Sequence, residues 1–350
     1  MSNIASQLRA EAAKRILIKD GAYGTQIQAE KLAEADYRGG LELSRDQKGN
    51  NDLLNLTRPE IVGGIADRFA GAGAEILATN SFNANRISQA DYGAEHLVRD
   101  INVAGARIIA ETARRFEAKD GRKRFVAGAL GPTNKTLSLS PNVNDPGYRE
   151  IDFDFLSDVY VEQIESLVEG GAEIVLIETV FDTLNAKAAI HATKVVEQRI
   201  GRELPMMLSM TITDLSGRNL SGHCIEAFWA SVRHARPLSI GLNCSIGAAQ
   251  LRAHVASLAG IADTLIMAYP NAGLPNDLGE YDEGPETTSR QVREWAEQGI
   301  VNIVGGCCGT TPEHIRAIAE QVKDYPPRQL PSDRSRRTML AGIAPMVLAA

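Results

Sequence analysis

A predicted strand passes directly into a predicted helix at the stretch Gly305-Gly306-Cys307-Cys308-Gly309-Thr310-Thr311-Pro312. The apolar residues of segment 301–304 before it are typical of a short buried strand. Thr311 can cap a helix that has Pro312 in its first turn. The two adjacent cysteines therefore lie where a strand ends and a helix begins, which is where barrel enzymes carry their catalytic groups.

The same order of strand and helix recurs along the sequence. We predict strands at residues 15–19, 75–79, 125–130, 173–178, 206–212, 239–243, 264–268 and 301–304. We predict helices, the first of them a surface helix, at residues 1–15, 59–71, 88–116, 152–169, 181–199, 225–235, 248–259, 286–298 and 312–323. Strands that alternate with helices form a parallel sheet, and eight such units predict an α/β fold of the (β/α)8 TIM barrel type. An open doubly wound sheet is the alternative, but such sheets usually have fewer parallel strands.

Residues 1–325 are expected to form a single barrel domain. Within it, the irregular segment at about 34–54 is expected to be an inserted loop that lies over one barrel end. The alternation of strand and helix stops after Tyr325-Pro326-Pro327. Residues 326–350 are therefore expected to form an extended tail or linker.

Composition and charge exclude several classes of protein. The 350 residues carry a net charge of −7 and no basic patch interleaved with aromatic residues, so the charge pattern of a nucleic-acid-binding protein is absent from the sequence. No apolar stretch reaches the roughly 18–20 residues that a membrane span requires, and the N-terminus lacks the apolar core of a signal peptide. A cytoplasmic location is expected. Four cysteines do not make a disulfide framework, and in a cytosolic chain they more often bind metal or act in catalysis.

Three of the cysteines follow predicted strands. Cys244 lies after the sixth strand, and Cys307 and Cys308 lie after the eighth. Because the carboxyl ends of barrel strands share one rim, the three thiolates can converge on Zn²⁺ and leave one coordination position open. The alternative is that all three are buried or incidental cysteines, but neighbours on a strand point to opposite faces, which makes core packing of an adjacent pair difficult. Cys224 is expected not to be a ligand, and geometry disfavours a disulfide between Cys307 and Cys308.

Polar residues follow other predicted strands on the same rim. Asp20 ends the first strand and Glu178 the fourth, Asn80 and Ser81 follow the second, and Asn271 follows the seventh. An open zinc site beside two carboxylates suits a small zwitterion that bears a thiol, because the acids can bind its ammonium group and loop N–H groups its carboxylate. The amide oxygen of Asn271 could fill the fourth zinc position before the substrate binds.

Each of these assignments has a structural alternative. Asp20 could cap a turn, and Glu178 could be a buried structural acid. Gly305 and Gly306 could instead mark the phosphate site that many barrels have after the eighth strand, but that interpretation leaves the cysteines unexplained.

Several short motifs carry these residues: Asp20-Gly21-Ala22-Tyr23-Gly24-Thr25, Thr79-Asn80-Ser81-Phe82-Asn83, Leu130-Gly131-Pro132-Thr133-Asn134, Ile177-Glu178-Thr179-Val180-Phe181-Asp182, Gly241-Leu242-Asn243-Cys244, Pro270-Asn271-Ala272-Gly273 and the stretch from Gly305 to Pro312. Over residues 5–345 the chain resembles the homocysteine S-methyltransferase family, and within it the homocysteine-binding barrels of the cobalamin-dependent methionine synthases. Tyr23 departs from the family pattern, in which Met is usual, so one wall of the pocket is expected to differ.

The resemblance implies a zinc-dependent methyltransferase that binds L-homocysteine as a zinc thiolate and methylates its sulfur to give methionine. By matching position, the zinc ligands would be Cys244, Cys307 and Cys308. The residues that bind the substrate would be Asp20 and Glu178 at its amino group and Gly21, Ala22, Asn80 and Ser81 at its carboxylate.

The expected methyl donor is methylcobalamin carried on another module. Cobalamin-binding and methyltetrahydrofolate-binding modules would then lie on a separate chain or a missing portion, because the motifs of this sequence provide neither site. The chain would be a separately encoded subunit or one module of a longer enzyme. Three alternatives stay open: a sulfonium or betaine-like donor such as S-methylmethionine, a non-catalytic module that binds zinc and thiols, and a barrel with a purely structural zinc.

Overall fold

The computed structural model describes residues 3–213, 216–276, 281–331 and 338–348. Its centre is one parallel sheet of eight strands: β1 (Leu17–Ile18), β2 (Ile76–Ala78), β3 (Phe125–Leu130), β4 (Ile174–Val180), β5 (Met206–Met210), β6 (Ser239–Gly247), β7 (Leu265–Asn271) and β8 (Ile303–Val304). The strand order runs from β1 through β8 and back along the sheet to β2. A bridge between Lys19 and Ile76 joins the two ends. The predicted (β/α)8 barrel is therefore confirmed.

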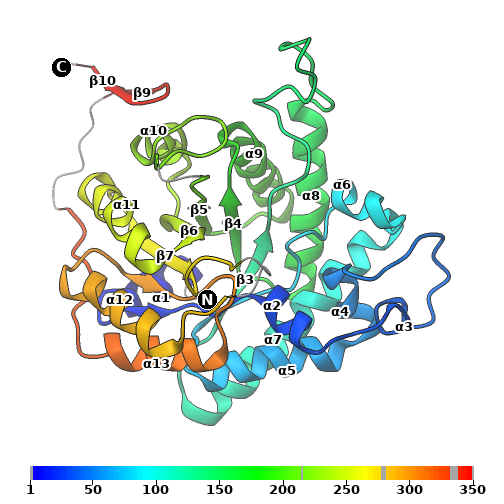
Figure 1. Cartoon of the computed structure of the whole chain (residues 1–350), viewed down its shortest axis with the longest axis horizontal. Coiled ribbons are helices and arrows are strands. Elements are labelled where there is room, and N and C mark those ends of the chain that lie inside the picture. Colours follow the sequence, from blue (N-terminus) through cyan, green and yellow to red (C-terminus); the bar gives the residue numbers. More distant parts are fainter. Residues whose placement is uncertain (1–2, 214–215, 277–280, 332–337, 349–350) are drawn as a thin grey trace.

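Helices surround this barrel (Figure 1). Those that follow the strands in the barrel pattern are α5 (Pro59–Gly71), α7 (Val98–Asp120), α8 (Phe153–Gly170), α9 (Thr183–Ile200), α10 (Ile225–Val232), α11 (Ala248–Ile261), α12 (Pro285–Glu297) and α13 (Pro312–Val322). Shorter helices are α2 (Tyr23–Ala29), α3 (Glu34–Arg38), α4 (Leu54–Thr57) and α6 (Arg86–Gln89). Within the described residues, no helix combines the length and the apolar character needed to cross a bilayer.

The barrel has an inner and an outer core. On β3, Phe125, Ala127 and Ala129 belong to the inner cluster, whereas Val126 belongs to the cluster between strands and helices. Successive side chains of a strand point to opposite faces, and in β3 both faces are buried along the whole strand. This explains the continuous apolar runs from which the strands could be predicted.

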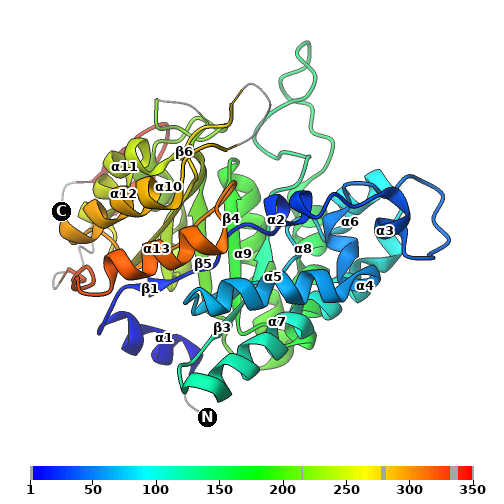
Figure 2. The same cartoon turned by 60° about the horizontal axis from the view of Figure 1, so that its bottom comes forward.

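Helix α1 (Ile4–Ala12) is not the surface helix that we predicted. Its residues Ala5, Leu8 and Ala12 belong to the inner core cluster, and Leu8 is fully buried. Figure 2 shows α1 (blue) below β1. The helix therefore closes the amino-terminal end of the barrel and leaves the opposite rim for the functional site.

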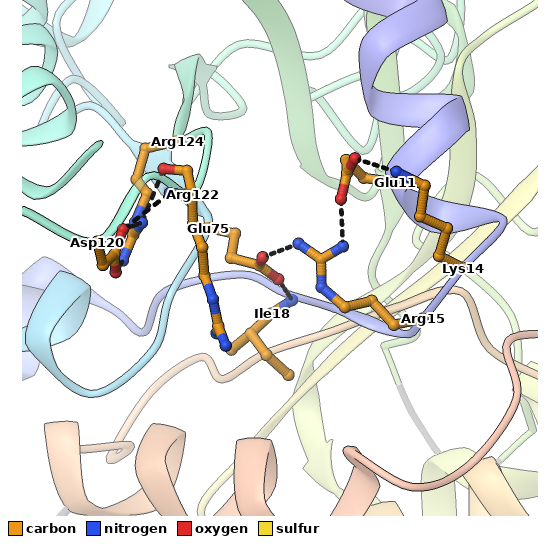
Figure 3. A network of polar contacts seen from close by, with 8 residues as sticks. All are labelled: Glu11, Lys14, Arg15, Ile18, Glu75, Asp120, Arg122 and Arg124. Atoms are coloured by element: carbon orange, nitrogen blue, oxygen red, sulfur yellow. Dashed lines mark hydrogen bonds and ion pairs between the residues drawn. The ribbon is translucent and has the colours of Figure 1, made fainter. Parts of the chain in front are cut away.

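Polar contacts fasten this closed end (Figure 3). The Arg15 guanidinium lies between two carboxylates, bonding Glu11 Oε2 at 2.5 Å and also Glu75. Glu75 in turn accepts a hydrogen bond from the backbone N–H of Ile18 at 3.4 Å. Arg15 thus ties α1 to the start of both β1 and β2.

The region from 88 to 116 is not the continuous helix that we predicted. Two short 3-10 turns, Ala90–Tyr92 and Glu95–Leu97, separate α6 from α7. Gly93 follows the first turn with a left-handed φ of 63°, a conformation that ends a helix. Residues predicted as one helix therefore form four elements.

The described part of segment 326–350 also differs from the extended tail that we expected. Arg328 is buried and donates hydrogen bonds to the carbonyl oxygens of Ala259, Ala262 and Thr264. Further on, β9 (Met339–Ala341) and β10 (Pro345–Val347) pair as an antiparallel hairpin beside α10 (Figure 1). The segment is thus folded back onto the barrel at two places.

Candidate metal centre and substrate pocket

A cavity of about 300 Å³ opens at the carboxyl ends of the strands. The loops after β1, β2 and β8 contribute to its wall, as do the carboxyl-terminal parts of β4, β6 and β7. The inserted segment contributes Asn51 and Asp52. Of the residues singled out in the sequence, those that line it are Gly21, Ala22, Asn80, Ser81, Glu178, Cys244, Cys307 and Cys308. Asp20 and Asn271 are not in this wall.

The three predicted cysteine ligands come together at one side of the cavity. All three Sγ atoms lie within 4.8 Å of one another, and those of Cys244 and Cys308 are 3.8 Å apart. A tetrahedral zinc with Zn–S bonds of about 2.3 Å requires S···S distances of about 3.8 Å. The Cys244–Cys308 distance therefore matches an edge of such a tetrahedron, and the three thiols form a set of ligands that Zn²⁺ prefers. Cys224, the remaining cysteine, is outside the cluster.

Local backbone geometry presents the thiols. Cys244 has a left-handed φ of 62° at a shift in the register between β6 and β7. After β8, the backbone N–H of Cys307 donates to Pro270 O at 2.8 Å, and the Cys308 carbonyl accepts from Ala272 N at 2.9 Å. The cysteine loop is thus attached to the end of β7.

The glycines around the paired cysteines are required by packing. A Cβ atom at Gly306 would lie 2.3 Å from Thr310 Oγ1, and one at Gly305 would lie 2.8 Å from the carbonyl oxygen of Lys19. Such distances are far inside van der Waals contact. The close approach of these chain segments accounts for the glycines, so they do not by themselves indicate a phosphate site.

Hydrogen bonds among the three thiols shift their pKa values in opposite directions. Hydrogen bonds from Cys244 and Cys307 lower the pKa of Cys308 to about 3. Hydrogen bonds with Cys244 and Cys308, together with burial, raise the pKa of Cys307 well above the usual range of a thiol. Only one of the three is then readily ionised without a cation, and a divalent ion would stabilise all three as thiolates.

Asn271 lies at the end of β7 next to this loop. Its side chain is 2% exposed, and no described residue gives its Oδ1 atom a hydrogen-bond partner. A buried acceptor without a partner is destabilising unless an ion or an ordered water satisfies it. The role of Asn271 as an exchangeable fourth zinc ligand stays a prediction.

The two predicted carboxylates have different surroundings. Glu178 is partly exposed to the cavity, and its Oε2 accepts a hydrogen bond from the Tyr269 hydroxyl at 2.9 Å. Asp20 is fully buried; its Oδ1 bonds Lys19 Nζ at 2.9 Å, and its Oδ2 bonds the backbone N–H of Ala78 at 2.7 Å. Glu178 is therefore open to a ligand, whereas both oxygens of Asp20 already have partners.

The loop after β2 is held firmly. Asn80 Nδ2 donates to Asn51 O at 2.8 Å and to Asn55 Oδ1 at 3.1 Å. Ser81 Oγ donates to Ala129 O at 2.8 Å. The predicted substrate loop is thus fixed between the inserted segment and β3, as a preformed pocket wall should be.

The family model described as homocysteine S-methyltransferase matches residues 17–322. The chain belongs to the homocysteine S-methyltransferase family. This methyltransferase is similar in fold to the homocysteine methyltransferase MmuM from Escherichia coli. The metallated form of that protein has 19% identity and a TM-score of 0.69 over 89% of this chain and 98% of that chain. Its oxidized form has 18% identity and a TM-score of 0.71 over 91% and 100%.

Two charged residues of the methyltransferase pocket were not predicted from the sequence. Lys19 and Asp52 both line the cavity, and both are almost fully buried. Lys19 could have been noticed in the sequence, because it is a charged residue at the end of an apolar strand and directly precedes Asp20. Burial raises the pKa of Asp52 to about 7, although the backbone N–H of Asn83 donates to its Oδ1 at 3.0 Å and opposes that rise.

Asn243 is a further residue without a predicted role. Its Oδ1 accepts hydrogen bonds from Thr179 N at 3.0 Å and Ser209 Oγ at 2.7 Å. Its Nδ2 donates to Thr179 Oγ1 at 2.8 Å and lies 3.8 Å from Cys307 Sγ. Since Thr179 has a strained φ of 58°, these bonds stabilise the backbone next to Glu178 and connect it to the cysteine cluster.

Proposed function

We propose that this chain is a zinc-dependent homocysteine S-methyltransferase that accepts a methyl group from methylcobalamin carried on another module. The observation that carries the proposal is the group of three thiols within 4.8 Å of one another, on the wall of a cavity large enough for an amino acid. Cys244, Cys307 and Cys308 would hold the zinc, and the oxygen of Asn271 would occupy the fourth position until the substrate binds.

Bound zinc supplies the Lewis acidity that converts a thiol, whose ordinary pKa is about 8.5, into a thiolate at neutral pH. The residues of the chain position the substrate. Glu178 binds the ammonium group, and the loops at Gly21-Ala22 and Asn80-Ser81 surround the rest of the amino acid. In the transfer, the substrate thiol loses its proton, a new S–CH₃ bond forms, and the donor keeps the electron pair of its broken bond to the methyl group.

The choice of donor follows from the resemblance to methionine synthase barrels and rests on no contact within the cavity. Cobalamin-binding and methyltetrahydrofolate-binding partners are part of the same proposal. That the E. coli relative has a metallated form supports the metal, and the family supports the methyl acceptor.

The test supplies zinc-loaded protein and homocysteine with methylcobalamin, S-methylmethionine or betaine in parallel, and measures methionine. Methionine from methylcobalamin is the expected result. Methionine formed only from S-methylmethionine or betaine would show that the proposed donor is wrong. No methionine with any donor would indicate a protein that binds thiols without catalysing methyl transfer. Cys224→Ser is the matched control for Cys308→Ser, because only Cys308 belongs to the thiol cluster.

A further inference from the structure

A long loop between β3 and α8, residues 131–152, extends beyond the carboxyl end of the barrel. Figure 2 shows this loop (green) at the end of the molecule opposite α1. Loops longer than about 15 residues without secondary structure are uncommon, and they are usually either functional or disordered. The internal contacts of this loop distinguish between the two.

Hydrogen bonds across the loop hold its two arms together. Arg149 donates from Nε to Leu137 O at 2.7 Å and from Nη2 to Ser138 O at 3.0 Å. Nearer the tip, the Ser140 hydroxyl donates to Asp145 O at 2.6 Å. The backbone of the loop is therefore ordered before any partner binds, which lowers the entropic cost of an interaction.

The base of the loop is attached to the rim beside the cavity. Ser138 donates from its backbone N–H and its hydroxyl to the two carboxylate oxygens of Asp182, at 2.8 and 2.6 Å. The backbone N–H of Leu137 donates to Asn185 Oδ1 at 3.0 Å. Asp182 caps α9 directly after β4, the strand that carries Glu178 into the cavity wall. The loop therefore has a fixed position next to the cavity.

The tip of the loop presents apolar side chains to solvent. Residues 141–148 are all exposed, with Val143 93% and Tyr148 46% exposed. Residues 140–144 carry no charge. One exposed valine would be ordinary, but a valine and a tyrosine on an ordered, protruding loop are typical of a contact with another protein, because aromatic residues are enriched in such contacts.

The size of the cavity limits how a corrin-bound methyl group can reach the substrate. The cavity holds about 300 Å³, enough for an amino acid, whereas a corrin ring with its side chains is larger. Helix α1 closes the opposite end of the barrel, so methylcobalamin has to approach at the carboxyl rim. The protein that carries it must then lie against this rim, from which the loop extends.

We propose that the tip of this loop, residues 140–148, is a docking surface for the protein that carries methylcobalamin. Val143 and Tyr148 supply the apolar contacts, and Arg149 is a positioning residue that keeps the tip in place. The proposal rests on the proposed function, since it specifies where the carrier of the same methyl donor binds.

The experiment compares two forms of one donor. Methionine formation by the zinc-loaded chain is measured with free methylcobalamin and with methylcobalamin bound to the isolated cobalamin-binding module of a methionine synthase. The double variant Val143→Ser/Tyr148→Ser should raise the KM for the module by at least about tenfold, the effect expected for the loss of an aromatic anchor. Its rate with free methylcobalamin should stay within about twofold of the unaltered protein.

A matched control removes two apolar side chains elsewhere. Ile200 and Ile261 are 36% and 40% exposed and end α9 and α11, at the amino-terminal side of the barrel. Ile200→Ser/Ile261→Ser should leave both reactions unchanged. Arg149→Gln keeps the apolar side chains but loses bonds across the loop, so it should raise the KM for the module by a smaller factor.

Three results would overturn the proposal. The first is an unchanged KM for the module in the double variant, and the second is an equal loss of rate with free methylcobalamin, which would give the loop a role in the pocket. The third is a dimer of the unaltered protein in sedimentation that the double variant dissociates, since a second copy would then cover the loop. Failure of the unaltered protein to form methionine from either form of methylcobalamin would instead overturn the proposed function.

Discussion

The change Tyr269→Phe removes one hydroxyl from between two charged residues of the pocket. In the structure this hydroxyl donates to Glu178 Oε2 at 2.9 Å, and the ring lies 4.5 Å from Lys19 Nζ. Phenylalanine keeps the ring and its contact with Lys19. The variant therefore isolates the hydrogen bond to Glu178.

The free energy of the lost hydrogen bond can be judged from its partners, a hydroxyl group and a carboxylate. A hydrogen bond to a charged group contributes about 1.5–3 kcal/mol, and one pKa unit corresponds to about 1.36 kcal/mol. Because Glu178 is partly exposed to the cavity, water can replace some of the lost interaction, so the lower value applies. Burial already raises the pKa of Glu178, against the charge of Lys19 and the Tyr269 hydroxyl, and the variant should raise it by about one unit more.

The assay is the pH dependence of homocysteine affinity, measured by calorimetry on zinc-loaded protein between about pH 5 and 9. Glu178 binds an ammonium group only when it is ionised, so affinity is lost as the pH falls through its pKa. In the variant this loss should occur about one pH unit higher. The folded-state pKa is also further above the unfolded value, so the variant should be less stable at neutral pH and regain stability as the pH falls toward about 4.5. Superimposable binding profiles of the two proteins would refute the assigned role of Glu178.

Three further predictions concern the cluster and its surroundings. Cys308→Ser should reduce bound zinc by at least tenfold at equal free zinc, measured by metal analysis after dialysis, whereas Cys224→Ser should keep it. Asp52→Asn should flatten the pH dependence of the free energy of unfolding. A carboxyl with a folded pKa of about 7 lowers that free energy by roughly 4 kcal/mol as the pH rises from about 4 to 7. Denaturant titrations at several pH values measure this dependence, and an unaltered slope in the variant would contradict the prediction. Gly306→Ala should lower stability by roughly 1–3 kcal/mol and weaken zinc binding, because its Cβ would lie 2.3 Å from Thr310 Oγ1; unchanged thermal unfolding and zinc content would contradict the packing argument.

The parts of the fold that sequence patterns predicted are those set by local sequence. The bounds of β3 and α5 agree with the prediction because Phe125–Leu130 is a continuous apolar run that ends at Gly131-Pro132, and α5 begins at Pro59. Counting the strands also predicted that one rim of the barrel carries the three cysteines Cys244, Cys307 and Cys308, because each follows a predicted strand. In a barrel, topology alone then determines that these ends converge.

The errors concern contacts that sequence periodicity does not report. Helix α1 has the polar content of a surface helix, yet its Leu8 is fully buried against the inner core at the amino-terminal end of the barrel. The role of Asp20 as a substrate ligand stays a prediction, but nothing in the sequence shows that Lys19 and Ala78 bond to both of its carboxylate oxygens. Such pairings depend on which face of the strand each residue takes and on a neighbour that is distant in sequence.

The pairing of β1 with β8 has a consequence for biosynthesis. Leu17 lies opposite Ile303, and these residues are 303 − 17 = 286 positions apart. The first strand therefore stays without this neighbour until the whole intervening segment has left the ribosome, and closing so long a segment is slow. Cys307 and Cys308 follow directly on the strand that completes the ring. An ion held by them together with Cys244 would bind only the closed ring, so binding of metal would follow closure and stabilise the closed barrel.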